Sequence, residues 1–365
     1  MHVGLRSLLA WLFLAPLAGG AGVRPVTLGL VVPPSEWDSA SLLRGVQLAV
    51  AEANETGDAP VGLEVRSEDG QWGTAGNEAV ILICNRHVDA IITPSDGAAS
   101  HLILQVSGRT RVPVASLCSD SSVTEAGIPW AVRVVPRTDQ AAMALFAAAQ
   151  RPDRPPLHWR AVIPAGRPGR AVRRDLGTAA RRTATLLDRI IEDGEPKTDV
   201  APLARTIVAA APGGVLLWLP PARAGRMAAA LRAAGYGGCL AGPSSLASPA
   251  FVGAAGAAAT RVLVTDFRTD ADPGGQAGQF EAQFRRRYDA EPDFSAAAAY
   301  DAARVLIETL RRAGNEVGYG QFPLALPTAG ATGVLRFDNS GNRTDALQVL
   351  ACQQGRFVAI PTTEK

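Results

Sequence analysis

The stretch of sequence that decides the fold is VTLGLVVPPSEWDSASLLRGVQLAVAEAN, residues 26–54. Its first seven residues, Val26–Val32, form an apolar run rich in β-branched side chains, which is typical of a buried parallel strand. Two prolines end that run. From Ser39 to Asn54 apolar residues recur at helical spacing, and Ser39 is suited to cap such a helix. The stretch therefore predicts a strand, a loop and a helix, which is how a βαβ unit begins.

The same alternation continues along the chain, with a proline-rich break at residues 150–156. Further strands are predicted at residues 61–69, 89–93, 112–116, 159–164, 214–221, 238–243, 260–267, 333–338 and 346–352. Further helices are predicted at residues 74–86, 97–107, 170–184, 199–211, 222–234, 276–289 and 295–313. Strands separated by helical stretches predict an α/β protein with two largely parallel sheets.

Length and charge narrow the class of protein. The chain has 365 residues, of which 47% are hydrophobic and 19% are charged, a composition typical of a globular protein. This length exceeds what one compact core usually holds, so two lobes are expected. The net charge of +2 provides no general field for nucleic acid or an anionic membrane surface, so no nucleic-acid partner is expected.

The N-terminus has the pattern of an export signal. Arg6 precedes an apolar run, Leu8–Leu17, which is shorter than the roughly 20 residues that span a bilayer. Small residues follow at 18–22. A signal peptide over residues 1–22, cleaved on export to the periplasm, is the prediction, with an uncleaved N-terminal anchor as the alternative.

The chain has four cysteines, Cys84, Cys118, Cys239 and Cys352. Their spacings are wide and form no CxxC pair, which argues against a metal site. In an oxidising compartment Cys84 and Cys118 could pair, and buried free thiols are the equally weighted alternative. No cofactor is expected.

The sequence offers no catalytic motif. It contains no GxSxG, HExxH, Walker or GxGxxG pattern. Ser119, Asp120 and His101 could be imagined as parts of a hydrolytic triad, but Ser119 lacks the glycines that flank a nucleophile on a sharp turn. The chain is therefore not expected to be an enzyme.

Four regions, taken in order, resemble one family. They are residues 26–54, with Gly45 and Asn54 in the helix; AIITPSDGAAS (90–100) with VPVASLCSDSS (112–122); RAAGYGGCLAGPSS (232–245); and AAAAYDAARVLIETLRRAG (296–314) with TGVLRFDNSGNR (332–343). The chain resembles the type I periplasmic solute-binding proteins of the branched-chain amino acid, amide and urea class over nearly its whole mature length.

The resemblance implies two Rossmann-like lobes with parallel central sheets, joined by a three-segment hinge. Residues 24–136 and 267–338 would form lobe 1, and residues 137–266 and 339–365 would form lobe 2. A small-molecule ligand would bind between them, at the C-terminal ends of the strands. The implied role is that of a monomeric binding component that serves an ABC transporter permease in the inner membrane. A ligand-sensing regulatory protein on the same fold is the alternative.

The same resemblance marks candidate ligand-binding residues. Trp37 lies in the loop after the first strand, and packing on the lobe is its alternative role. Candidates after later strands are Ser95, Asp96, Gly97, Ser119 and Asp120 in lobe 1, and Arg167 and Ser244 in lobe 2. Helix capping is the alternative for the serines, and exposure to solvent is the alternative for Arg167.

One departure from the family bears on the ligand. Amino acid binders of this class generally carry an acidic residue where this chain has Ser244 and Ser245. An ammonium group left without a partner in a closed cleft is costly. The expected ligand is therefore a small polar or amphipathic metabolite other than a typical branched-chain amino acid.

Overall fold

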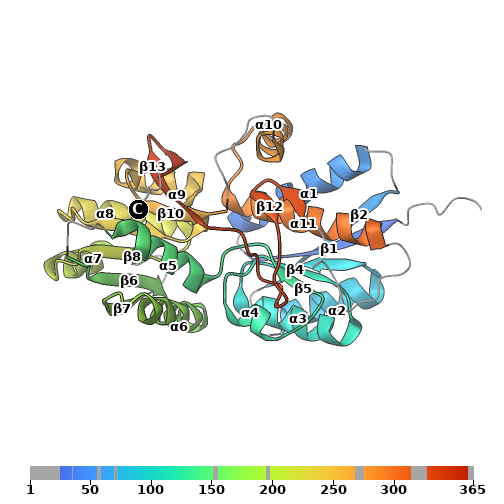
Figure 1. The fold of residues 1–365 in the computed structure, drawn as a ribbon, viewed down its shortest axis with the longest axis horizontal. Coiled ribbons are helices and arrows are strands. Elements are labelled where there is room, and N and C mark those ends of the chain that lie inside the picture. The colour runs from blue at the N-terminus through green and yellow to red at the C-terminus, as the bar shows by residue number, and fades with distance from the viewer. Residues whose placement is uncertain are drawn as a thin grey trace, which may run out of the picture.

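The computed structural model of the chain describes residues 25–34, 36–55, 59–69, 71, 73–150, 155–194, 198–267, 275–313 and 327–360. The expected signal peptide, residues 1–22, lies outside them. Figure 1 shows two lobes, and the blue N-terminal elements share their lobe with the orange helices from late in the chain. No described helix combines the length and the hydropathy that crossing a membrane would need.

Lobe 1 is built on a sheet whose described strands run in the order β2-β1-β3-β4-β5, and every pair is parallel. Mostly apolar runs buried on both faces form β1, β3 and β4, as expected for a parallel sheet, whereas the edge strand β2 is partly exposed. The strands are β1 (Val26–Val32), β2 (Val61–Ser67), β3 (Ala90–Ile92), β4 (Val114–Ser116) and β5 (Ala131–Arg133).

Helices cover both faces of this sheet. One face packs against α1 (Glu36–Glu55), α10 (Gln276–Tyr288) and α11 (Phe294–Ala313). The other packs against α2 (Thr74–Val80), its π-helical continuation Ile81–Asn85, and α3 (Gly97–Thr110). A short helix, α4 (Ser122–Glu125), and an antiparallel ribbon, β11 (Thr328–Gly330) with β12 (Gly333–Leu335), complete the described part of the lobe.

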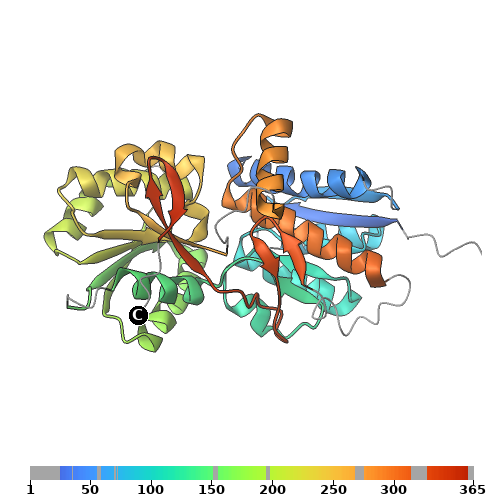
Figure 2. The same ribbon diagram turned by 45° about the horizontal axis from the view of Figure 1, so that its top comes forward.

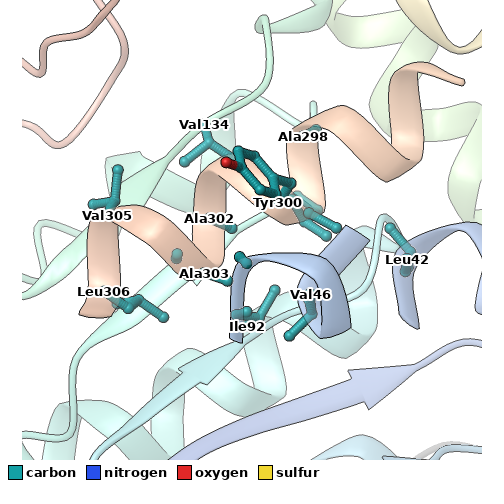
Figure 3. Close-up of a cluster of buried hydrophobic side chains, with 14 of the residues drawn as sticks. Leu42, Val46, Ile92, Val134, Ala298, Tyr300, Ala302, Ala303, Val305 and Leu306 are labelled. Atoms are coloured by element: carbon teal, nitrogen blue, oxygen red, sulfur yellow. The ribbon is translucent and has the colours of Figure 1, made fainter. Parts of the chain in front are cut away.

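Figure 3 shows α11 lying over α1 and the sheet, with Val46, Ile92 and Tyr300 among the buried side chains. The two helices approach so closely that a Cβ atom added at Gly45 would lie 2.1 Å from the carbonyl oxygen of Ala296. The central glycine of α1 is therefore required by backbone packing, since any side chain there would push the helices apart.

Lobe 2 is built on a second sheet, with described strands in the order β14-β13-β10-β9-β8-β6-β7. The strands from β10 to β7 are parallel, whereas β13 and β14 join antiparallel, so the expected parallel sheet carries a C-terminal hairpin at its edge. The strands are β6 (Trp159–Pro164), β7 (Leu187–Asp193), β8 (Gly214–Leu217), β9 (Cys239–Gly242), β10 (Leu263–Asp266), β13 (Gln348–Gln353) and β14 (Arg356–Ala359).

This sheet is also covered on both faces. One core includes α5 (Thr138–Ala149) and α6 (Gly166–Arg182). The other includes α7 (Ala201–Ala209), α8 (Pro221–Ala233) and α9 (Pro249–Ala255), with the 3₁₀ turns Ser244–Leu246 and Gly256–Ala259.

Followed through the described elements, the chain passes between the lobes after β5, after β10 and after β12. Figures 1 and 2 show the red C-terminal segment running from the ribbon of lobe 1 to the hairpin of lobe 2. The backbone N–H of Arg133 donates to the carbonyl of Gly341 at 2.8 Å, and Asn342 bridges to Arg133. Residues 341 and 342 are thus still attached to lobe 1, and the third passage follows them.

Arg343 contacts all three passages. Its Nη1 donates to the carbonyl of Val134 at 3.4 Å, and its Nε donates to Asp345 Oδ2 at 2.6 Å. Its guanidinium carbon lies 4.0 Å from the centre of the Phe267 ring, and its Nη2 donates to the carbonyl of Thr332 at 2.8 Å. The Arg343 side chain is only 1% exposed. We call Arg343, Val134, Phe267 and Asp345 the hinge cluster.

Several elements differ from the prediction. Helix α6 begins at Gly166 rather than at residue 170. Pro168 lies in the first turn of this helix, where its missing N–H would have no partner in the helix. Strand β7, LDRIIED, is largely exposed at the sheet edge and therefore lacks the apolar run of a buried strand. All four cysteines are free thiols.

Candidate functional site

Strands of both lobes end at a common cavity of about 390 Å³. Parallel strands bring their C-terminal ends, and the residues that follow them, to one edge of a sheet. Here β3, β4, β6, β8 and β9 all do so, and the N-terminal part of α11 joins them. We call this cavity the apolar compartment. It is lined by Leu42, Leu117, Val135, Pro136, Ala141, Pro164, Val172, Trp218, Leu219, Pro220, Pro221, Pro243, Phe294 and Ala298, and by the hydroxyl residues Ser95, Ser119, Thr138, Ser244, Ser245 and Ser295.

Among the described residues that line the apolar compartment, none carries a charge. Two aromatic residues from opposite lobes, Trp218 and Phe294, contribute to its wall. A mostly apolar pocket with a few hydroxyl groups is the usual architecture of a small-molecule site, in which the apolar wall supplies affinity and the polar groups fix orientation.

A second cavity of about 380 Å³ adjoins the first. It shares Ser95, Ser119, Thr138 and Val172 with the apolar compartment. We call it the polar compartment. Its other lining residues include Asp96, Asp120, His101 and Arg167, so the charged groups of the described cleft lie here.

The structure brings most of the candidate residues together. Ser95 and Ser119 line both compartments, Ser244 lines the apolar one, and the polar one is lined by Asp96, Gly97, Asp120 and Arg167. The side chain of Trp37 lies outside the described part of the chain. That any of these residues touches a solute stays a prediction.

Asp96 acts as a helix cap. It is the N-cap residue of α3, and its Oδ1 accepts a hydrogen bond from the backbone N–H of Ala99 at 2.8 Å. A carboxylate in this position neutralises the positive end of the helix and satisfies one of its free N–H groups. The helix end is therefore occupied by the protein's own acid.

Asp120 is held by donors from both lobes. Its Oδ1 accepts from Ser122 Oγ at 2.7 Å and from Arg174 Nη2, on α6 of lobe 2, at 2.5 Å. Burial of the Asp120 carboxyl opposes ionisation, but the hydrogen bonds and the Arg174 charge outweigh it and lower its pKa. Asp120 is thus an ionised group that already has partners.

The geometry around His101 argues against catalysis. His101 Nε2 lies 2.9 Å from Ser122 Oγ, whose single proton is donated to Asp120. The imidazole must therefore donate to this hydroxyl, and it cannot serve as its base. The nearby Cys118 is no better as a nucleophile, because burial raises the pKa of its thiol to about 12.

Two residues of the site were missed at the sequence level. Trp218 is not among the predicted candidates, yet it packs in the core of lobe 2 and also lines the apolar compartment. Arg133 was not singled out, yet its buried guanidinium donates to the carbonyls of Cys118 at 2.9 Å, Asp120 at 2.6 Å and Ser121 at 3.1 Å. The signal that could have identified Arg133 is a single arginine within an otherwise apolar run of strand residues, because an arginine is rarely buried without a partner.

The comparisons with known proteins agree with this architecture. The chain resembles a leucine-binding protein of Thermotoga maritima, with 19% identity, 92% of this chain and 97% of that chain covered, and a TM-score of 0.78. It also resembles an R. palustris solute-binding protein solved with benzoate, with 16% identity, coverage of 92% and 96%, and a TM-score of 0.80. A Streptococcus pneumoniae substrate-binding protein solved with isoleucine gives 16% identity, coverage of 92% and 99%, and a TM-score of 0.77.

These identities are low, so the solved structures establish the fold, which is that of the type I periplasmic binding proteins. No curated protein sequence matches the chain. The model of a family described as periplasmic binding protein matches residues 25–322. This match confirms the resemblance stated from the sequence and agrees with the expectation of a non-enzymatic role. The chain belongs to the periplasmic binding protein family.

Proposed function

We propose that this protein is the periplasmic solute-binding component of an ABC importer, and that it closes on a small amphipathic metabolite and delivers it to a permease in the inner membrane. The observation that carries the proposal is the apolar compartment, whose wall is supplied by both lobes. A solute that contacts both lobes at once favours the closed arrangement, and closure of this kind is what a transporter can sense.

The lining indicates the character of the solute. Apolar side chains such as Leu42, Trp218 and Phe294 would bury a hydrocarbon or aromatic body, and burial stabilises by roughly 25 cal/mol per Å² of apolar surface. Hydroxyl groups of Ser119, Ser244 and other lining residues would bind a polar group. An amphipathic metabolite matches both features.

A branched-chain amino acid fits this lining poorly. Its ammonium group would need a carboxylate or several acceptors, and among the described lining of the apolar compartment there is no acidic side chain. Asp96 and Asp120 lie in the adjoining compartment, where one caps α3 and the other pairs with Arg174. The solutes named for similar structures include benzoate as well as leucine and isoleucine, so proteins of this fold hold ligands both with and without an ammonium group.

The test begins by identifying the solute that co-purifies with the protein, by mass spectrometry after denaturation. The recovered compound is then added back in a thermal-shift assay, where a solute at 100 times its Kd stabilises the folded state by about 2.7 kcal/mol. Absence of any specific solute, and of any stabilisation across a library of exported metabolites, would contradict the proposal.

A matched pair of variants locates the site. Ser245→Trp places an indole in the apolar compartment, whereas Leu186→Trp places one on an exposed position of the same lobe, where Leu186 is 48% exposed. We expect the thermal shift to be lost in the first variant and kept in the second. Equal shifts in both would move the binding site elsewhere.

A further inference from the structure

Beside the polar compartment, side chains join the two lobes directly. The backbone N–H of Ser121, in lobe 1, donates to Asp175 Oδ2 at 3.0 Å, and Ser121 Oγ donates to Asp175 Oδ1 at 2.7 Å. Asp175 lies on α6 of lobe 2. The neighbouring Arg174 donates to Asp120 Oδ1 at 2.5 Å and to Ser121 Oγ at 2.9 Å. We call Asp120, Ser121, Arg174 and Asp175 the latch.

The Asp175 carboxylate depends on lobe 1 for its partners. Asp175 is 2% exposed and Ser121 is 5% exposed, so neither is well solvated in this arrangement. Asp175 accepts hydrogen bonds from two groups of Ser121 and, within its own lobe, from Arg174 Nε at 2.9 Å. Separating the lobes removes both Ser121 donors, and hydrogen bonds to a charged group are among the stronger ones.

The lobe 1 half of the latch is preformed. Arg133, at the end of β5, donates hydrogen bonds to the carbonyls of Cys118, Asp120 and Ser121. It also donates to Thr124 Oγ1 at 2.9 Å. These bonds fix the loop whose side chains reach Asp175 and whose Ser119 lines both compartments. Because the loop is already ordered, docking it on lobe 2 costs little further conformational entropy.

We propose that Asp175 is a positioning residue for the cleft: it fixes the loop that carries Ser119 and Asp120 against lobe 2, and so holds the two lobes closed at the polar compartment. The importance of this closure for solute binding rests on the proposed function. The closure itself does not depend on the proposed function, because all of its contacts are between residues of the protein.

The test uses the full chain without added solute. Asp175→Ala and the milder Asp175→Asn are compared with Asp193→Asn, which alters another buried acid of lobe 2 whose partner Arg223 is in the same lobe. Small-angle scattering is expected to show a larger radius of gyration for Asp175→Ala, a smaller increase for Asp175→Asn, and no change for Asp193→Asn. Amide exchange at Ser121 should become roughly tenfold to a hundredfold faster in Asp175→Ala, less so in Asp175→Asn, and should not change in Asp193→Asn.

Two results would overturn the inference. One is wild-type scattering and wild-type exchange at Ser121 in an Asp175→Ala protein that has a native near-ultraviolet circular dichroism spectrum. The other is an equal expansion in Asp193→Asn, because general loosening of lobe 2 would then explain both. If Asp175→Ala does not fold, Asp175→Asn and Ser121→Ala decide in the same way. A wild-type protein that keeps this closure but binds no solute would instead count against the proposed function.

Discussion

The hinge cluster and the latch both join the two lobes, and their ion pairs differ in burial more than in length. Arg343 reaches Asp345 at 2.6 Å in the hinge cluster, and Arg174 reaches Asp120 at 2.5 Å in the latch. The Arg343 side chain is 1% exposed, whereas that of Arg174 is 46% exposed. Breaking a buried pair leaves an uncompensated charge, and breaking an exposed pair returns it to water. The Arg343 ion pair of the hinge cluster is therefore the more costly one to break, whereas the Arg174 ion pair of the latch can open.

The largest effect is expected at the hinge cluster. Arg343→Met keeps the length of the side chain but removes its bonds to Val134, Thr332 and Asp345. Removing one partner of a buried pair costs about 3 kcal/mol or more, so the free energy of unfolding in urea should fall by that amount.

Arg336→Met is the matched control. Arg336 also faces Asp345, at 3.7 Å, but its side chain is 56% exposed, so a loss below about 1 kcal/mol is expected. Similar losses in the two variants would remove the distinction that we draw between a buried and an exposed contact.

An intermediate effect is expected at the support of the latch. Arg133→Met leaves the buried carbonyls of Cys118, Asp120 and Ser121 without their donor, which should lower the free energy of unfolding by about 2 kcal/mol. Amide exchange in residues 118–124 should accelerate more than in strand β1. Uniform acceleration over lobe 1 would mean that Arg133 supports the core and not this loop.

The smallest effect is expected at the exposed half of the latch. Arg174→Gln should lower the free energy of unfolding by less than about 1 kcal/mol at 0.1 M KCl. At 1 M KCl, where the Debye length is only about 3 Å, most of the difference from wild type should disappear. Arg173→Gln, which removes an exposed ion pair within lobe 2, is the matched control. Small-angle scattering of Arg173→Gln should show the lobes still closed, because its ion pair does not join them.

Much of the fold could be predicted from the sequence, because apolar runs and helical spacing report burial directly. The strand β1 and the helix α11 are where the pattern placed them, and Gly45 has a physical reason in the packing of α1 on α11. Elements with little apolar signal were missed, as β7 at a sheet edge shows. The N-terminal turn of α6, GRPG, was missed because glycine and proline are poor helix formers away from a helix end.

The candidate site was predictable in part for a related reason. Residues after strand ends could be expected to meet, and Ser95, Ser119 and Ser244 do line one cavity. The partners of those residues could not be predicted, because they come from other parts of the chain. Asp175 binds Ser121 from the middle of a helix, and Arg343 joins three passages that are far apart in sequence.

The central claim is that a solute binds between the lobes, in the apolar compartment. A crystal structure of the protein with the solute that co-purifies with it tests this claim most directly. We expect electron density in contact with Trp218 of lobe 2 and Phe294 of lobe 1, with the latch closed. Density on the outer surface of one lobe, or a solute that touches a single lobe, would contradict the account.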